Sequence, residues 1–153
     1  MSEAQARKVA LIIGAGDATG PAIARRFARE GYVACLTRRS ADKLQPLVDE
    51  IRAAGGEAHG FASDARKEDQ VTALVDDIES RLGPMNIYVA HVVIDGAIDT
   101  AFIRDGFPDK FATRDQPEIL SPEHIADAYW YLHSQPRDAW TFELDLRPWM
   151  ERW

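Results

Sequence analysis

The sequence predicts an α/β fold built on a parallel sheet, and three observations predict it. The chain is 153 residues long and 46% hydrophobic, which suits one globular domain. Short apolar runs alternate with amphipathic segments of helical length. The first apolar run, 8–13, leads into a glycine-rich turn and a proline that opens a helix. Strands separated by helices form right-handed units with parallel strands, so we expect a doubly wound, Rossmann-like sheet of about five strands, in the order 3-2-1-4-5 and in three layers.

The first half of the chain is assigned from its apolar periodicity. The continuous apolar run at 8–13 suits a strand buried on both faces. Pro21 suits the first turn of a helix, where its missing N–H costs nothing, and Gly31 suits the end of that helix. Ser40 is a candidate N-cap for the next helix. The other predicted elements are strands at 32–37, 57–62 and 85–94 and helices at 41–54 and 67–82.

The second half of the chain is less regular. Residues 100–116 contain glycine, proline and many charges, which favours a lid-like loop with one short helix. Ser121 and Pro122 match the N-cap and first position of a helix ending near His133, although His124 stands where a capping box needs Glu or Gln. An alternating pattern at 141–146 predicts a last strand.

Composition and charge argue against several classes of function. A net charge of −7 and a pI near 5.0 disfavour a nucleic-acid binder, which needs a basic face. No apolar run approaches a membrane span, and the first residues lack a signal-peptide core, so we expect a cytoplasmic protein without membrane contact. The single cysteine, Cys35, is expected to be a buried small hydrophobe. The scattered histidines lack metal-site spacing, so no metal is expected.

The glycine-rich turn is the first candidate binding site. It follows a buried strand and opens a helix, as a dinucleotide site requires. Gly14 permits the tight turn, Gly16 lets the backbone approach a pyrophosphate, and Gly20 allows the helix to pack closely on the strand. The amides and dipole of the helix then face the phosphates. The alternative is an ordinary glycine-rich turn; we expect NADP(H) or NAD(H), held by its pyrophosphate.

The end of the second predicted strand bears on the choice of dinucleotide. An NAD site usually places Asp or Glu there to bind the ribose hydroxyls, whereas this chain has Thr37, Arg38 and Arg39. An arginine at this place accommodates a 2′-phosphate through charge-assisted hydrogen bonds. We therefore expect NADP(H) to be preferred, with NAD(H) as the alternative; a solvated basic turn would also explain these arginines.

These residues resemble the short-chain dehydrogenase/reductase family. In its motif T-G-x-x-x-G-x-G, the first and last glycines match Gly14 and Gly20, with Ala18 and Ile13 replacing the middle glycine and the threonine. Three further segments are similar to family patterns: 64–65 to the Asp that contacts adenine, 95–100 to P-G-x-I-x-T beside the nicotinamide and phosphates, and 121–132 to a late helix. The turn, the strand end and the resemblance together predict these cofactor-binding residues: Gly14, Gly16, Asp17, Ala18, Thr19, Gly20, Thr37, Arg38, Arg39, Asp64, Ala65, Ile98 and Thr100.

One part of the family pattern is missing from this chain. Between their fourth and sixth strands, complete members carry N-N-A-G, two long helices, a catalytic Ser and Y-x-x-x-K. No tyrosine here is followed by a lysine at that spacing, and 82–87 looks like a junction across the missing segment. The resemblance implies an oxidoreductase ancestry. Loss of general acid–base help alone lowers rates by about 10²–10⁴, so we predict low or no activity by the standard Tyr/Lys chemistry and no assigned catalytic residue.

Two alternatives for function stay open. Tyr129 and His133 are four residues apart on a predicted helix, so they can form the relocated acid of an active NAD(P)H-dependent oxidoreductase. The pattern favours the simpler interpretation, a partly buried Tyr and a helix-terminal His that interacts with the helix dipole. The missing helices form the family's main dimer interface. The uncovered sheet flank and the C-terminal tryptophans Trp140, Trp149 and Trp153 therefore suit a self-associating, non-catalytic module or homo-oligomer, or else a buried core.

For domain organisation, we expect a single domain over residues 1–153. Its dinucleotide-binding half is 1–94, and 95–153 supplies the loop, the late helix, the last strand and the aromatic tail.

Overall fold

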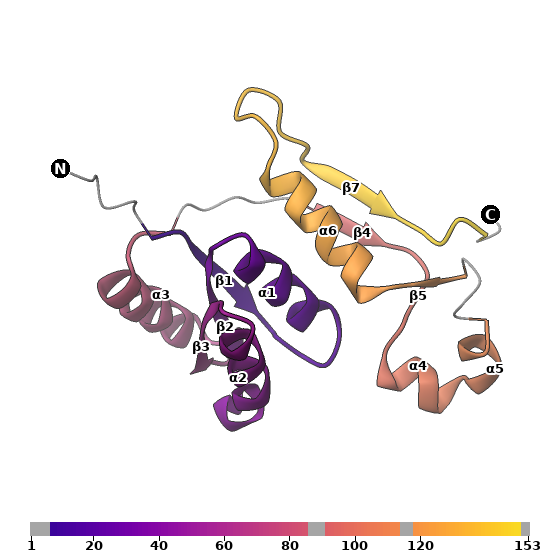
Figure 1. Cartoon of the computed structure of the whole chain (residues 1–153), viewed down its shortest axis with the longest axis horizontal. Helices are drawn as coiled ribbons and strands as arrows, with labels where there is room; N and C mark the ends of the chain where they lie inside the picture. The colour runs from indigo at the N-terminus through magenta and orange to yellow at the C-terminus, as the bar shows by residue number, and fades with distance from the viewer. Residues whose placement is uncertain (1–6, 86–90, 114–117, 151–153) are drawn as a thin grey trace. The chain divides into compact units, whose positions relative to one another are not determined.

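A computed structural model of the chain describes residues 7–85, 91–113 and 118–150. The chain falls into two compact units, each described here by itself (Figure 1). The first unit comprises residues 1–16 and 24–87, and the second comprises 17–23 and 88–153. The structure thus describes two units, and the single domain over 1–153 stays a prediction.

The first unit is built on a parallel sheet of β1 (Val9–Ile13), β2 (Val33–Arg38) and β3 (Glu57–Ala62). β2 lies in the middle, with Val9 of β1 opposite Val33 and with Cys35 opposite His59 of β3. Every residue of β2 from Val33 to Thr37 is buried, as expected for a strand covered on both faces. The predicted order 3-2-1 for these strands is therefore confirmed.

Helices cover both faces of this sheet. Its helical elements are α1 (Thr19–Arg29), whose first residues belong to the second unit, the 3-10 helix η1 (Ala41–Leu44), α2 (Gln45–Ala53) and α3 (Glu68–Leu82). On one face, Leu44 and Val48 lie against Gly60 of β3. Figure 1 shows α3 on the opposite side of the sheet from α2. The first unit therefore has the three layers that the sequence predicts.

One core cluster of the first unit lies between the sheet and α3. The strands contribute Val9, Val33 and Cys35, and α3 contributes Leu74, Ile78 and Leu82. Cys35 has no exposed surface, which confirms the prediction that it is a buried small hydrophobe. Burial, together with the negative charge of Glu57, raises the pKa of the Cys35 thiol to about 12. The thiol is therefore protonated at neutral pH, as suits a buried structural cysteine.

Two predicted helix starts, those of α1 and α2, are corrected. α1 begins at Thr19 rather than at Pro21, which leaves the proline inside the first turn, where no N–H is needed. The single helix predicted over 41–54 is instead η1 followed by α2, with Pro46 at the start of α2. The break falls there because proline cannot donate the N–H that a continuous helix requires. Ser40 precedes η1 but its side chain makes no capping hydrogen bond.

The second unit contains two short parallel pairs of strands. β4 (His91–Ile94) pairs with β7 (Glu143–Leu146), which confirms the predicted neighbours 4 and 5. β5 (Ala97–Ile98) pairs with β6 (Ile119–Leu120). The predicted strand 85–94 is observed only from His91, and residues 86–90 lie outside the described part. The first and fourth strands were predicted to be neighbours in one sheet, but β1 and β4 belong to separate sheets in different units.

The loop predicted over 100–116 contains two short helices instead of one. These are α4 (Ala101–Gly106) and α5 (Pro108–Phe111), and residues 114–117 lie outside the described part. The Thr100 hydroxyl accepts a hydrogen bond from the Ile103 amide at 3.2 Å and so begins α4. Pro108 begins the second helix, because its fixed backbone angle suits a first turn.

The late helix α6 (Pro122–His133) begins as predicted. The Ser121 hydroxyl accepts a hydrogen bond from the Glu123 amide at 3.1 Å, which confirms Ser121 as the N-cap. Among the helices that the structure describes, none is both long enough and apolar enough to cross a bilayer.

The aromatic residues near the C-terminus are exposed. Trp140 is 46% exposed, Phe142 71% and Trp149 84%, so the reading of these residues as buried core is wrong. Trp149 lies in a turn after β7 rather than on a helix. A turn does not bring side chains at helical spacing onto one face that can pack against the protein. Trp153 lies outside the described residues.

Candidate functional site

The glycine-rich turn is held against the end of β2. Gly14 has a φ of 81°, a left-handed conformation that glycine adopts at little cost. Its amide donates to the Thr37 hydroxyl at 3.3 Å, and the Ala15 amide donates to the Thr37 carbonyl at 2.9 Å. Thr37 is only 1% exposed. Thr37 was predicted to bind the cofactor, and in the structure it positions the turn.

The amides at the start of α1 are the donors available to an anion. In the turn before the helix, the amides of Gly14 and Ala15 donate to Thr37, and the Gly16 amide donates to the Gly14 carbonyl at 2.7 Å. A helix leaves its first N–H groups without partners inside the helix, and Pro21 has none to offer. Thr19 and Gly20 carry the first N–H groups of α1, and the helix dipole adds positive potential there.

The space beside Gly16 fits a close-lying phosphate group. Among the described residues beyond its immediate neighbours, the nearest atom to a Cβ built on Gly16 is the Gly14 carbonyl oxygen, at 3.9 Å. Protein packing therefore does not require glycine at this position. The open space beside Gly16 has the form that a diphosphate cradle needs, where glycine lets a ligand lie close to the backbone.

The carboxyl ends of β2 and β3 bring basic and acidic side chains to one edge. Arg38 ends β2, and its carbonyl accepts a hydrogen bond from the Ser63 amide at 3.0 Å. Arg39 follows it and is exposed. The Asp64 carboxylate accepts two hydrogen bonds from the Arg66 guanidinium, from Nε at 2.9 Å and from Nη2 at 2.7 Å. These bonds hold the pKa of the Asp64 carboxyl well below its usual range.

Arg66 was not among the predicted site residues. The signal that could have indicated it is the spacing Asp64-x-Arg66, because a side-chain pair two residues apart can close a tight turn after a strand. Ala65, predicted to contact the cofactor, lies exposed in this turn.

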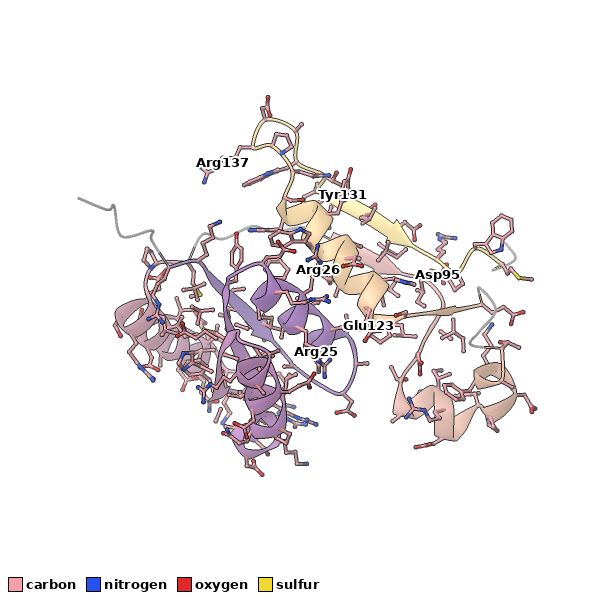
Figure 2. The ribbon with its side chains drawn as sticks, viewed as in Figure 1. Arg25, Arg26, Asp95, Glu123, Tyr131 and Arg137 are labelled. Carbon is pink, nitrogen blue, oxygen red and sulfur yellow. The ribbon has the colours of Figure 1, made fainter. Side chains whose placement is uncertain are left out.

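The other predicted site residues, Ile98 and Thr100, lie in the second unit. Ile98 ends β5, and the Thr100 hydroxyl caps α4. Asp95, labelled in Figure 2, directly follows β4; its amide donates to the Leu146 carbonyl at 3.0 Å and its carboxylate pairs with Arg147 at 3.4 Å. Asp95 replaces the proline of the family pattern, and its bonds fix the 95–100 segment to β7.

The pair considered for a relocated acid lies on α6. Tyr129 is half-buried, and burial raises the pKa of its hydroxyl. The His133 ring lies 5.7 Å from the Trp130 ring. Tyr131, labelled on the same helix in Figure 2, is exposed. A raised pKa makes Tyr129 a weaker acid, which is the opposite of what proton donation to a carbonyl needs.

Potential metal-ligating side chains are dispersed in the part of the chain that the structure describes. No three His, Cys, Asp or Glu side chains there are grouped to hold a metal ion.

A parallel β–α–β sheet with a glycine turn at the carboxyl end of its first strand defines a Rossmann-type α/β protein. The model of the short chain dehydrogenase family matches residues 8–106. The chain therefore belongs to the short-chain dehydrogenase family, which is a family of oxidoreductases.

Individual relatives agree with this assignment. A short chain dehydrogenase of Pseudocercospora fijiensis is 40% identical over 83 residues, which cover 54% of this chain and 26% of the relative. The crystal structure of a short-chain dehydrogenase from Rhodopseudomonas palustris is 26% identical with a TM-score of 0.67, covering 95% of this chain and 100% of that chain. A metagenomic short-chain oxidoreductase in complex with NADP shares the fold at 20% identity and a TM-score of 0.66, covering 92% and 97%. The chain spans only 26% to 39% of the length of the first curated relatives it matches.

Proposed function

We propose that this chain binds a nicotinamide dinucleotide, prefers NADP(H) to NAD(H), and does not carry out the standard Tyr/Lys chemistry of its family. The observation that carries the proposal is the glycine turn. Its own amides are bonded to Thr37 and Gly14, and the space beside Gly16 and the first amides of α1 remain for a diphosphate. A neighbour of the same fold that holds NADP supports this assignment.

The preference for NADP(H) rests on the end of β2. Arg38 and Arg39 stand where an NAD site usually has a carboxylate. A guanidinium offers a planar set of donors that matches phosphate oxygens, and its charge is permanent. A carboxylate at this place would repel a 2′-phosphate, whereas these arginines attract it.

The absence of standard chemistry rests on the sequence and on α6. The chain has no Tyr-x-x-x-Lys pair. Tyr129, the candidate substitute, has a raised pKa, which makes it a weaker proton donor and supports the proposal. We expect Ile98, Thr100 and the helix-mouth residues 17–20 to contribute to the dinucleotide site as the resemblance implies, and we expect a cytoplasmic protein.

Calorimetric titration with NADPH and NADH tests this proposal. We expect Arg39→Ala and Arg38→Ala each to weaken NADPH binding by about tenfold, because one charge-assisted contact to the 2′-phosphate is lost, and to change NADH binding little. Arg29→Ala, at an exposed arginine in the last turn of α1, is the matched control and should change neither.

Two outcomes would contradict the proposal. The first is no binding of either dinucleotide at millimolar concentration. The second is steady NADPH consumption with carbonyl substrates that Tyr129→Phe abolishes, because this would show an active enzyme with a relocated acid.

Self-association is a second candidate property, favoured by the exposed aromatic side chains of the second unit. Phe102 is 72% exposed, Phe142 71% and Trp149 84%, and exposed apolar surface of this kind often marks an interface. We expect sedimentation of the full chain to show dimers or larger species, and Phe142→Ser with Trp149→Ser to shift them to monomer. A monomer at every concentration would remove this candidate.

A further inference from the structure

We infer that Arg66 is a further specificity-determining residue: its guanidinium, held in place by Asp64, hydrogen-bonds the 2′-phosphate of an adenosine nucleotide beside Arg39. This inference rests on the proposed function and names a residue that neither the glycine motif nor the end of β2 includes. It follows from how the turn after β3 is built.

The turn after β3 holds the Arg66 side chain in one orientation. Both Asp64 carboxylate oxygens accept from the guanidinium, and Oδ1 also accepts from the Arg66 amide at 3.2 Å. The Asp64 amide in turn donates to Gln70 Oε1 at 2.9 Å, which ties the turn to α3. A guanidinium fixed in this way loses little further conformational entropy when it binds a ligand.

The same guanidinium is open to a ligand. The Arg66 side chain is 74% exposed, whereas that of Asp64 is 17% exposed. Asp64 is bonded to Nε and Nη2, so Nη1 and the second N–H of Nη2 face away from the carboxylate. These N–H groups can bind phosphate oxygens in the planar, two-point manner that arginine favours.

The charges around this turn suit a phosphate. The Ser63 amide joins the turn to the Arg38 carbonyl at 3.0 Å, so it adjoins the end of β2. Arg39 is close enough that its charge helps to lower the pKa of the Asp64 carboxyl. Three arginines and one aspartate leave this edge with a net positive charge, which complements the charge of about −1.5 to −2 on a phosphate monoester.

This arrangement also reassigns Asp64. The family resemblance implies that Asp64 contacts adenine. In this chain both of its oxygens are bonded to Arg66, so Asp64 acts as a positioning residue for the guanidinium.

The test uses the full chain and two nucleotides that differ only at the 2′ position. Adenosine 2′,5′-bisphosphate carries the 2′-phosphate, and adenosine 5′-monophosphate does not. By calorimetry, we expect Arg66→Gln to lower the affinity for the bisphosphate by about 10- to 100-fold and to leave that for the monophosphate within about twofold. Arg66→Lys keeps the charge but not the two-point geometry. Its affinity for the bisphosphate should lie between that of the unmodified chain and that of Arg66→Gln. Arg29→Gln controls for the change in total charge.

The outcomes separate the inference from the proposed function. Equal losses for both nucleotides, no loss for either, or tighter binding after Arg66→Gln would overturn the inference while nucleotide binding itself persists. Tighter binding would mean that Arg66 competes with adenine for Asp64. If the unmodified chain binds neither nucleotide and no dinucleotide, the proposed function fails, and the inference fails with it. Thermal melts of each variant establish that it is folded.

Discussion

Replacing Gly16 with alanine is expected to weaken NADPH binding by about 10- to 100-fold without destabilising the protein. A Cβ at this position lies 3.9 Å from the Gly14 carbonyl oxygen, so the folded chain has room for it. A bound diphosphate would occupy that room, and steric overlap of this kind costs about 1–3 kcal/mol, which corresponds to the stated change in Kd. Fewer unfolded conformations should even raise the free energy of unfolding by about 0.4–1 kcal/mol.

Calorimetric titration and urea denaturation of the same preparation measure the two effects together. Gly106→Ala is the matched control, because a Cβ there meets no atom within 4 Å, and that glycine ends α4 outside the turn. It should leave NADPH binding unchanged. Unaltered NADPH affinity in Gly16→Ala would show that no ligand approaches this backbone, and the assignment of the diphosphate site would be wrong.

Replacing Ile78 with alanine is expected to lower the free energy of unfolding by about 2–5 kcal/mol. Ile78 lies in the middle of α3, has no exposed surface, and belongs to the cluster with Val9 and Cys35. Alanine removes the methyl and methylene groups that fill this space, and strands paired into a sheet cannot collapse fully into the cavity. For a domain with a total stability of about 5–15 kcal/mol, this is a large fraction.

Urea denaturation followed by circular dichroism measures this loss. Thr72→Ala is the control on the same helix, because Thr72 is exposed and its replacement should stay within about 0.5 kcal/mol. A loss below about 1 kcal/mol for Ile78→Ala would mean that α3 does not pack on the sheet as described.

Features that depend on neighbouring residues were predicted well from the sequence. The order of β1, β2 and β3 follows from short connections between apolar runs, and Ser121 caps α6 because its hydroxyl needs only the next turn of the same helix. The prediction for the start of α2 was wrong, and the prediction of one short helix after Thr100 was incomplete. Pro46 and Pro108 stand where the unpredicted helix starts lie.

The candidate site was predicted in part. The sequence indicated the glycine turn and the two arginines, and the binding roles of these residues stay predictions. The role of Thr37 in holding the turn and the pairing of Asp64 with Arg66 were not foreseen. A sequence shows which donors and acceptors a chain has, but it does not show which of them the fold has already joined to each other.

The family, the β–α–β order and the absence of a Tyr-x-x-x-Lys pair can all be predicted from the order of residue types along the chain. The hydrogen bonds that hold the glycine turn and the exposure of the aromatic side chains became evident only in the folded chain. Hydrogen bonding and burial depend on segments that are distant in sequence, such as those of Gly14 and Thr37, and these segments meet only when the sheet forms.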